Sequence, residues 1–176
     1  GFLLHFGLSF CFPFYHSVSD VQPNFIKYLY RVKSITEFKN DISFLLKYFK
    51  PISVEDFVKF TEGKFIITEN SFLLSFDDGL SSLNDIAPFL VDNKISALFF
   101  LNKDFVDNKS LFYRYKVSLL IDEICNSEIS DMKMHELKRV LGYDFINKNI
   151  LVELLKKFTH KDIKQIDELA VILGFS

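Results

Sequence analysis

Three nearly continuous hydrophobic runs occur in the first hundred positions, and after them the hydrophobic residues recur at helical spacing. The runs at 7–15, 71–76 and 95–101 are almost wholly apolar, which favours strands that are covered on both faces. Residues 82–93, between the last two runs, have the pattern of a helix. The order strand, helix, strand predicts a parallel pair joined by a right-handed crossover.

Two further helices are predicted between the first and second runs. The helix that opens at 34–36 has Thr36 as its expected N-cap, carries an apolar stripe and is terminated by Pro51. The stripe comprises Phe38, Ile42, Leu45, Leu46 and Phe49. Ser53 is expected to cap a second short helix, which leads to a turn at 62–64. A polar turn is expected at 16–20, directly after the first run.

The pattern becomes purely helical after Asn102. Four segments, 111–124, 131–141, 147–158 and 161–173, have apolar residues at helical spacing with Lys and Glu on the opposite faces. We therefore expect an α/β fold over residues 1–105, followed by a helical insertion or subdomain over residues 106–176.

Composition and charge exclude several functional classes. With 176 residues the chain forms one domain or a piece of one, and the 49% hydrophobic content excludes a disordered chain. The 21 basic and 23 acidic residues leave a net charge of −2, so nucleic acid is not an expected partner. The apolar run at 1–15 is too short for a transmembrane segment and lacks the features of a signal peptide, which leaves the compartment open. Cys11 and Cys125 are interpreted as buried or idle thiols.

Two adjacent carboxylates follow the second run. Asp77 and Asp78 stand at the carboxyl end of an expected parallel strand, where ligand sites gather in α/β folds. Successive residues that leave a strand point in different directions, so one carboxylate can bind a cation while the other acts as a base. Gly79 allows a sharp turn. The alternative is a polar turn in which Asp78 caps the next helix.

Three segments in this order resemble the opening of the polysaccharide deacetylase (nodulation-protein-B-like, NodB-like) family. They are residues 14–20 (Phe-Tyr-His-Ser-Val-Ser-Asp), residues 72–79, which end in Ser-Phe-Asp-Asp-Gly, and residues 97–101 (Ala-Leu-Phe-Phe-Leu). The second segment is similar to the family's first motif, usually Thr-Phe-Asp-Asp-Gly. The resemblance covers roughly the first two thirds of the chain and implies a partial, distorted (β/α) barrel.

The resemblance also implies a reaction and roles for the two carboxylates. In the family the first Asp is the general base and the second binds the metal, roles that correspond to Asp77 and Asp78. The implied cofactor is a divalent metal ion, with zinc expected, and the implied partner is an N-acetylated polysaccharide or glycan. The metal activates water and polarises the acetamide carbonyl, so that the C–N bond is hydrolysed to acetate and an amine.

The chain also departs from the family. The remaining metal ligands of the family come from a His-x-x-x-His motif, but the histidines here, His5, His16, His135 and His160, are nowhere four apart. We expect the chain to be truncated before that motif. The alternative is a catalytically inactive carbohydrate-binding or scaffold relative of the same fold.

Other side chains are candidates for substrate contacts. His16 follows the first strand, where it can contact substrate or support Asp77, although a hydrogen-bonded turn histidine is the alternative. Tyr113 and Arg114 open the helical part and combine a ring with positive charge, as in a sugar-binding groove, although they also fit a helix start packed in a core. A phosphoryl-transfer site of the haloacid dehalogenase type is disfavoured because that family spaces its carboxylates as Asp-x-Asp.

Overall fold

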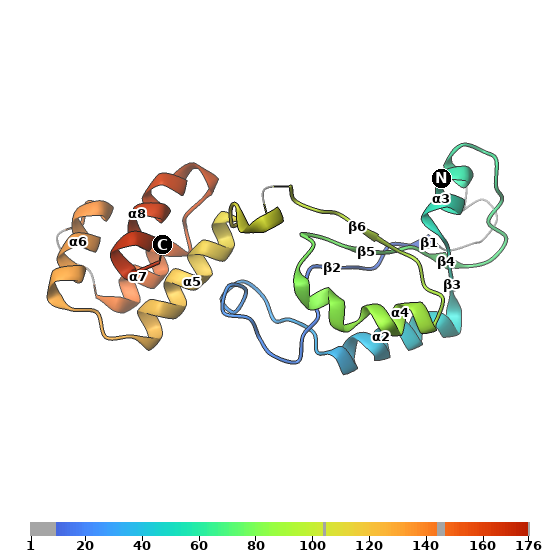
Figure 1. Ribbon diagram of the computed structural model, residues 1–176, viewed down its shortest axis with the longest axis horizontal. Helices are drawn as coiled ribbons and strands as arrows, with labels where there is room; N and C mark the ends of the chain where they lie inside the picture. The colour runs from blue at the N-terminus through green and yellow to red at the C-terminus, as the bar shows by residue number, and fades with distance from the viewer. Residues whose placement is uncertain (1–9, 104, 144–146, 176) are drawn as a thin grey trace. The chain divides into compact units, whose positions relative to one another are not determined.

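The computed structural model describes residues 10–103, 105–143 and 147–175 and divides into two compact units. Unit 1 comprises Gly1–Val21 and Val32–Lys103, and unit 2 comprises Gln22–Arg31 and Asp104–Ser176. Strands and helices alternate in unit 1, whereas the regular elements of unit 2 are helices (Figure 1). The protein is therefore a mixed α/β protein with small parallel sheets.

All strand pairs of unit 1 in the described residues are parallel. They form two three-stranded sheets, ordered β1-β4-β3 and β2-β5-β6. The strands are β1 (Phe10–Cys11), β2 (Phe14–Tyr15), β3 (Lys50–Pro51), β4 (Ser71–Phe72), β5 (Leu74–Phe76) and β6 (Ala97–Phe99).

Backbone hydrogen bonds continue across the break between β4 and β5. The N–H groups of Leu73, Ser75 and Asp77 donate to carbonyl oxygens in the 11–15 segment at 2.9–3.2 Å. The carbonyl oxygens of Phe72 and Phe76 point to the other edge, where they accept bonds from the chain just after β3 and β6. Because neighbouring residues of a strand bond to opposite sides, residues 71–77 act as one central strand with partners on both edges.

The two faces of this central strand are covered by different helices. Figure 1 shows α2 (Ile35–Tyr48) and α4 (Ala87–Asp92) on the same side of the strands, where Phe38, Phe72 and Phe76 are fully buried. Leu73 points the other way and packs with Ile52 and Ile67 near α3 (Val54–Thr61). Burial on both faces explains why the sequence is apolar at every position from 72 to 74.

The short elements of unit 1 differ in detail from the sequence prediction. The N-cap of α2 is Ser34, not Thr36, because Ser34 and Glu37 form a reciprocal capping box. The prediction of Ser53 as the cap of α3 is confirmed. The helix expected at 82–93 is divided into a 3₁₀ turn, η1 (Ser81–Asp85), and α4. Part of the first predicted strand, 7–9, lies outside the described residues.

The buried face of α2, the end of that helix and the strand β3 also differ from the sequence prediction. Phe38 and Ile42 of the stripe are buried, but Leu46 is exposed, so the buried face is narrower than the stripe. The helix ends at Tyr48, before Pro51. Pro51 itself belongs to β3, a strand that the periodicity does not signal.

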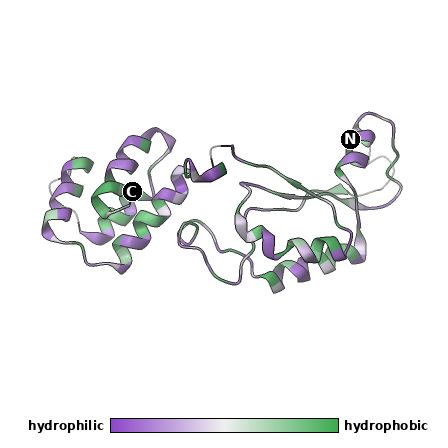
Figure 2. Ribbon diagram, viewed as in Figure 1, coloured by the Kyte–Doolittle hydropathy of each residue, from purple (hydrophilic) through white to green (hydrophobic). Residues whose placement is uncertain are grey.

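In its described residues, unit 2 is a cluster of four α-helices at the four segments predicted to be helical. They are α5 (Tyr113–Asn126), α6 (Asp131–Leu141), α7 (Lys148–Leu155) and α8 (Ile163–Leu173). Each contributes leucine or isoleucine side chains to one core, and polar and apolar stretches alternate along the helices in Figure 2. The buried core residues are Val117, Leu120, Ile121, Ile124, Leu137, Leu141, Leu151, Leu155, Ile166, Leu169 and Leu173.

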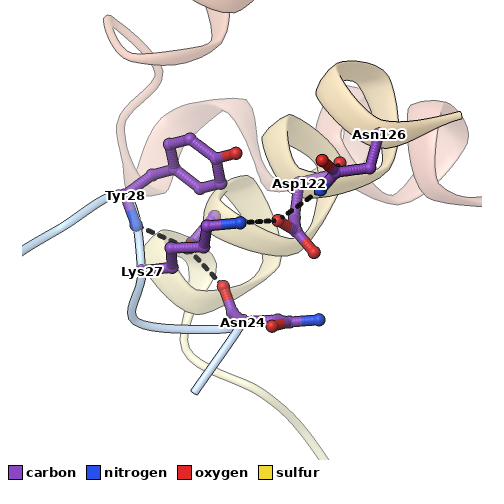
Figure 3. Close-up of polar contacts among 6 residues, drawn as sticks. Asn24, Lys27, Tyr28, Asp122 and Asn126 are labelled. Carbon is purple, nitrogen blue, oxygen red and sulfur yellow. Dashed lines mark hydrogen bonds and ion pairs between the residues drawn. The ribbon is translucent and has the colours of Figure 1, made fainter. Parts of the chain in front are cut away.

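A loop from the N-terminal half completes unit 2. The fully buried hydroxyl of Ser118 donates to the carbonyl oxygen of Asn24 at 2.8 Å and accepts from the backbone N–H of Tyr28 at 3.2 Å. Lys27 pairs with Asp122 at 2.8 Å, as Figure 3 shows. These contacts fasten the segment 22–31 to α5. None of the helices in the described ranges is long and apolar enough to cross a membrane.

Candidate functional site

The carboxyl ends of β2 and β5 bring His16 next to Asp77. Tyr15 and Phe76 are register partners in the parallel pair, so the residues that follow them leave the sheet side by side. His16 Nε2 lies 3.8 Å from Asp77 Oδ2, and each side chain is about one third exposed. The structure therefore brings together two of the candidate residues predicted from the sequence. Both side chains are accessible to solvent.

Asp78 and Gly79 turn the chain sharply after β5. Both have left-handed backbone angles, with φ of 67° at Asp78 and 64° at Gly79. A non-glycine residue with positive φ is uncommon, and such conformations concentrate at functional sites and tight turns. A Cβ atom added at Gly79 would overlap Cδ2 of Leu101, so glycine also leaves space for the chain that follows β6.

A hydrogen bond between side chains ties the two loops of this site together. The hydroxyl oxygens of Ser17 and Ser82 are 2.9 Å apart, and Ser17 is almost fully buried. Ser17 lies beside His16, and Ser82 belongs to η1, just after the Asp77–Gly79 turn. The sequence analysis missed this pair. Its only signal is that each serine adjoins a candidate site segment.

A second polar network lies beneath the site, against α2. The hydroxyl of Tyr15 donates to Asp41 Oδ2 at 2.9 Å, and Lys33 forms an ion pair with the same oxygen. Burial, and then the hydrogen bond and charge of Asp41, raise the pKa of Tyr15 far above its ordinary value. Tyr15 therefore stays neutral and anchors the end of β2, which positions His16.

The donors at the strand ends fit a metal ion only in part. Carboxylate and imidazole groups are suitable ligands for zinc. Over residues 10–103, 105–143 and 147–175, however, no three His, Cys, Asp or Glu side chains are grouped closely enough to hold a cation. Asp77, Asp78 and His16 therefore provide donors of the right type but not a complete set of ligands. His5 lies outside the described residues.

Tyr113 and Arg114 belong to unit 2, where they stand at the start of α5. Arg114 Nε donates to the hydroxyl of Tyr113 at 3.1 Å, and the guanidinium carbon lies 5.7 Å from the centre of the Tyr113 ring. Both residues line a pocket of about 240 Å³ within unit 2. They form a basic and aromatic site of their own there.

Comparisons with known proteins provide no assignment for either site. None of the protein-family models matches the chain, and no curated protein sequence matches it. The functional interpretation therefore depends on the chain's motifs and on the local geometry.

Proposed function

We propose that unit 1 carries part of the catalytic site of a metal-dependent deacetylase, which hydrolyses the acetamide of an N-acetylated glycan. Asp77 would be the general base and Asp78 a metal ligand, and the parallel strands would be part of a distorted (β/α) barrel. The observation that carries the proposal is the Asp-Asp-Gly turn at the end of the central parallel strand, with His16 Nε2 3.8 Å from Asp77.

The chemistry assigned to these residues is proton transfer and orientation. Asp77 is exposed enough to accept a proton from a water molecule that attacks the acetamide carbon. His16 would orient Asp77, while the left-handed turn would direct Asp78 away from it. A divalent cation, when bound, would polarise the carbonyl and make the water more acidic. Hydrolysis adds the OH of water to the acetyl carbon and its proton to the nitrogen.

A non-catalytic carbohydrate-binding or scaffold protein of the same fold is the second candidate. The observation that favours it is the spacing of the histidines, since no two of the four are four residues apart. Under this alternative, the Asp77–Gly79 turn would be a structural feature or a contact to a sugar hydroxyl.

The test is acetate release from N-acetylglucosamine oligomers by the product of the complete coding region, with added zinc and after chelation. The deacetylase proposal predicts zinc-dependent release that Asp77→Asn lowers by about 10²–10⁴-fold. Asp78→Asn should abolish the response to zinc, and His16→Gln should lower kcat less than Asp77→Asn does. Asp92→Asn, which changes an exposed carboxylate at the end of α4, is the matched control and should have no effect.

Each candidate fails on a different result. Oligomer binding without acetate release, unaffected by zinc, would reject the deacetylase and favour the binding protein. Absence of both binding and release would reject both candidates.

A further inference from the structure

Unit 2 contains a pocket whose lining combines aromatic rings with positive charge. Its volume is about 240 Å³, and three rings line it, those of Tyr28, Tyr113 and Phe158. Arg114 and Lys156 supply the charged groups. Leu29 of the 22–31 loop and the buried core residues Val117, Ile121 and Leu155 form the rest of the wall. Among the described residues the lining contains no carboxylate, so its charge favours a negatively charged ligand.

The walls of the pocket are held in place before any ligand binds. Tyr28 lies on the same loop as Asn24 and Lys27 (Figure 3). Its backbone N–H donates to the hydroxyl of Ser118 in α5 at 3.2 Å. Tyr113 is the first residue of α5, and its hydroxyl accepts a hydrogen bond from Arg114 Nε. A site whose rings are already ordered loses little conformational entropy on binding.

Arg114 and Lys156 differ in whether a carboxylate of the protein already pairs with their charge. In the described residues no carboxylate pairs with Arg114, whose Nε uses one of the five guanidinium N–H donors on Tyr113. Lys156 pairs with Glu153 at 2.7 Å, an exposed contact one turn apart on α7 and its C-cap. Exposed pairs of this kind are weak and exchange readily with another anion.

We propose that this pocket binds a single sugar ring that carries a carboxylate or a phosphate group. The planar fork of Arg114 suits two oxygens of one oxyanion, and Lys156 adds a second charge. The C–H face of a sugar ring packs on an aromatic ring, while the Tyr113 hydroxyl, which accepts from Arg114, retains its own O–H to donate to the polar edge of the sugar. The volume lies below that of ordinary drug-sized sites, which fits one ring and not an extended chain. The inference does not depend on the proposed function, because it uses residues of unit 2 alone.

Titration of the whole chain, followed by backbone amide NMR shifts, tests the pocket. The probes are glucuronate, glucose 6-phosphate, neutral glucose and inorganic phosphate. Either acidic sugar should shift resonances of Tyr113, Arg114 and Phe158, more weakly at high salt because the contact is charged. Which acidic sugar binds more tightly distinguishes a uronate from a sugar phosphate. Glucose and inorganic phosphate should bind at least tenfold more weakly.

Matched variants locate the binding. Arg114→Gln should lower the affinity for the more tightly bound acidic sugar by about tenfold or more. Lys156→Gln should lower the same affinity independently. Glu153→Gln should tighten binding several-fold because it frees Lys156, a gain that damage to the fold would not produce. Lys157→Gln, an exposed neighbour outside the lining, should leave affinity unchanged. The proposal is overturned if inorganic phosphate binds as tightly as the sugars, if no probe binds, or if Arg114→Gln retains affinity.

Discussion

His16 Nε2 lies 3.8 Å from Asp77 Oδ2, although two helices separate these residues along the chain. The parallel register Tyr15↔Phe76 is the cause, since it places the next residue of each strand at the same end of the sheet. The Ser17–Ser82 hydrogen bond then fixes the loops that follow. The approach of His16 to Asp77 thus follows from the strand pairing, and the serine hydrogen bond adds to it.

Gly79→Ala should destabilise the protein more than the same change at Gly63. Both glycines have left-handed φ, 64° and 73°, where an alanine costs about 1–2 kcal/mol. A Cβ at Gly79 would also overlap Leu101, whereas one at Gly63 meets nothing within 4 Å. Urea unfolding of both variants measures the difference. Equal losses would show that Leu101 moves aside without cost.

Ser34→Ala should lower the free energy of unfolding by about 1 kcal/mol, because the capping box of α2 loses its hydroxyl. Thr36→Ala is the matched control. Thr36 is exposed within the first turn of α2, so its loss should change stability by less than about 0.5 kcal/mol. Thermal or urea unfolding compares the two. A larger effect at Thr36 would contradict the observed cap.

The strong patterns of the sequence predict the elements of this protein better than they predict the contacts between them. The four helices of unit 2 and the central strand follow from periodicity and apolar runs, because burial dictates both. Lys50–Pro51 forms a strand that no pattern signals, since its two residues depend on pairing with β4. Asp77 and Asp78 are evident from the sequence. The approach of His16 to Asp77 requires the register, which a single sequence does not specify.

The membership of the loop 22–31 in unit 2 is another contact that the sequence does not predict. Nothing in its composition connects it to helices that begin some 80 residues later. Two of the hydrogen bonds that make the connection involve one buried serine of α5, Ser118, whose partners are backbone groups that every residue carries.

Tyr15→Phe should remove a pH dependence of stability at alkaline pH. The pKa of Tyr15 is raised by burial and by Asp41, so the folded protein holds this proton more tightly than the unfolded chain. The resulting stabilisation is complete below about pH 10, the unfolded value, and declines as the pH rises toward the folded pKa. Urea unfolding from neutral to alkaline pH should show this decline in the wild type and a smaller one in the variant. Tyr48→Phe, at an exposed ring, is the control and should retain the wild-type slope.

Ser118→Ala should loosen the loop 22–31 without disrupting the helices. The change removes the acceptor of the Tyr28 N–H and the donor to the Asn24 carbonyl, at a cost of about 1–3 kcal/mol. Trypsin should then cleave faster after Lys27, which is already exposed but held in an ordered segment. Ser110→Ala, at an exposed position before α5, should leave the cleavage rate unchanged. Unchanged cleavage in Ser118→Ala would mean that the Lys27–Asp122 pair and the packing of Tyr28 hold the loop by themselves.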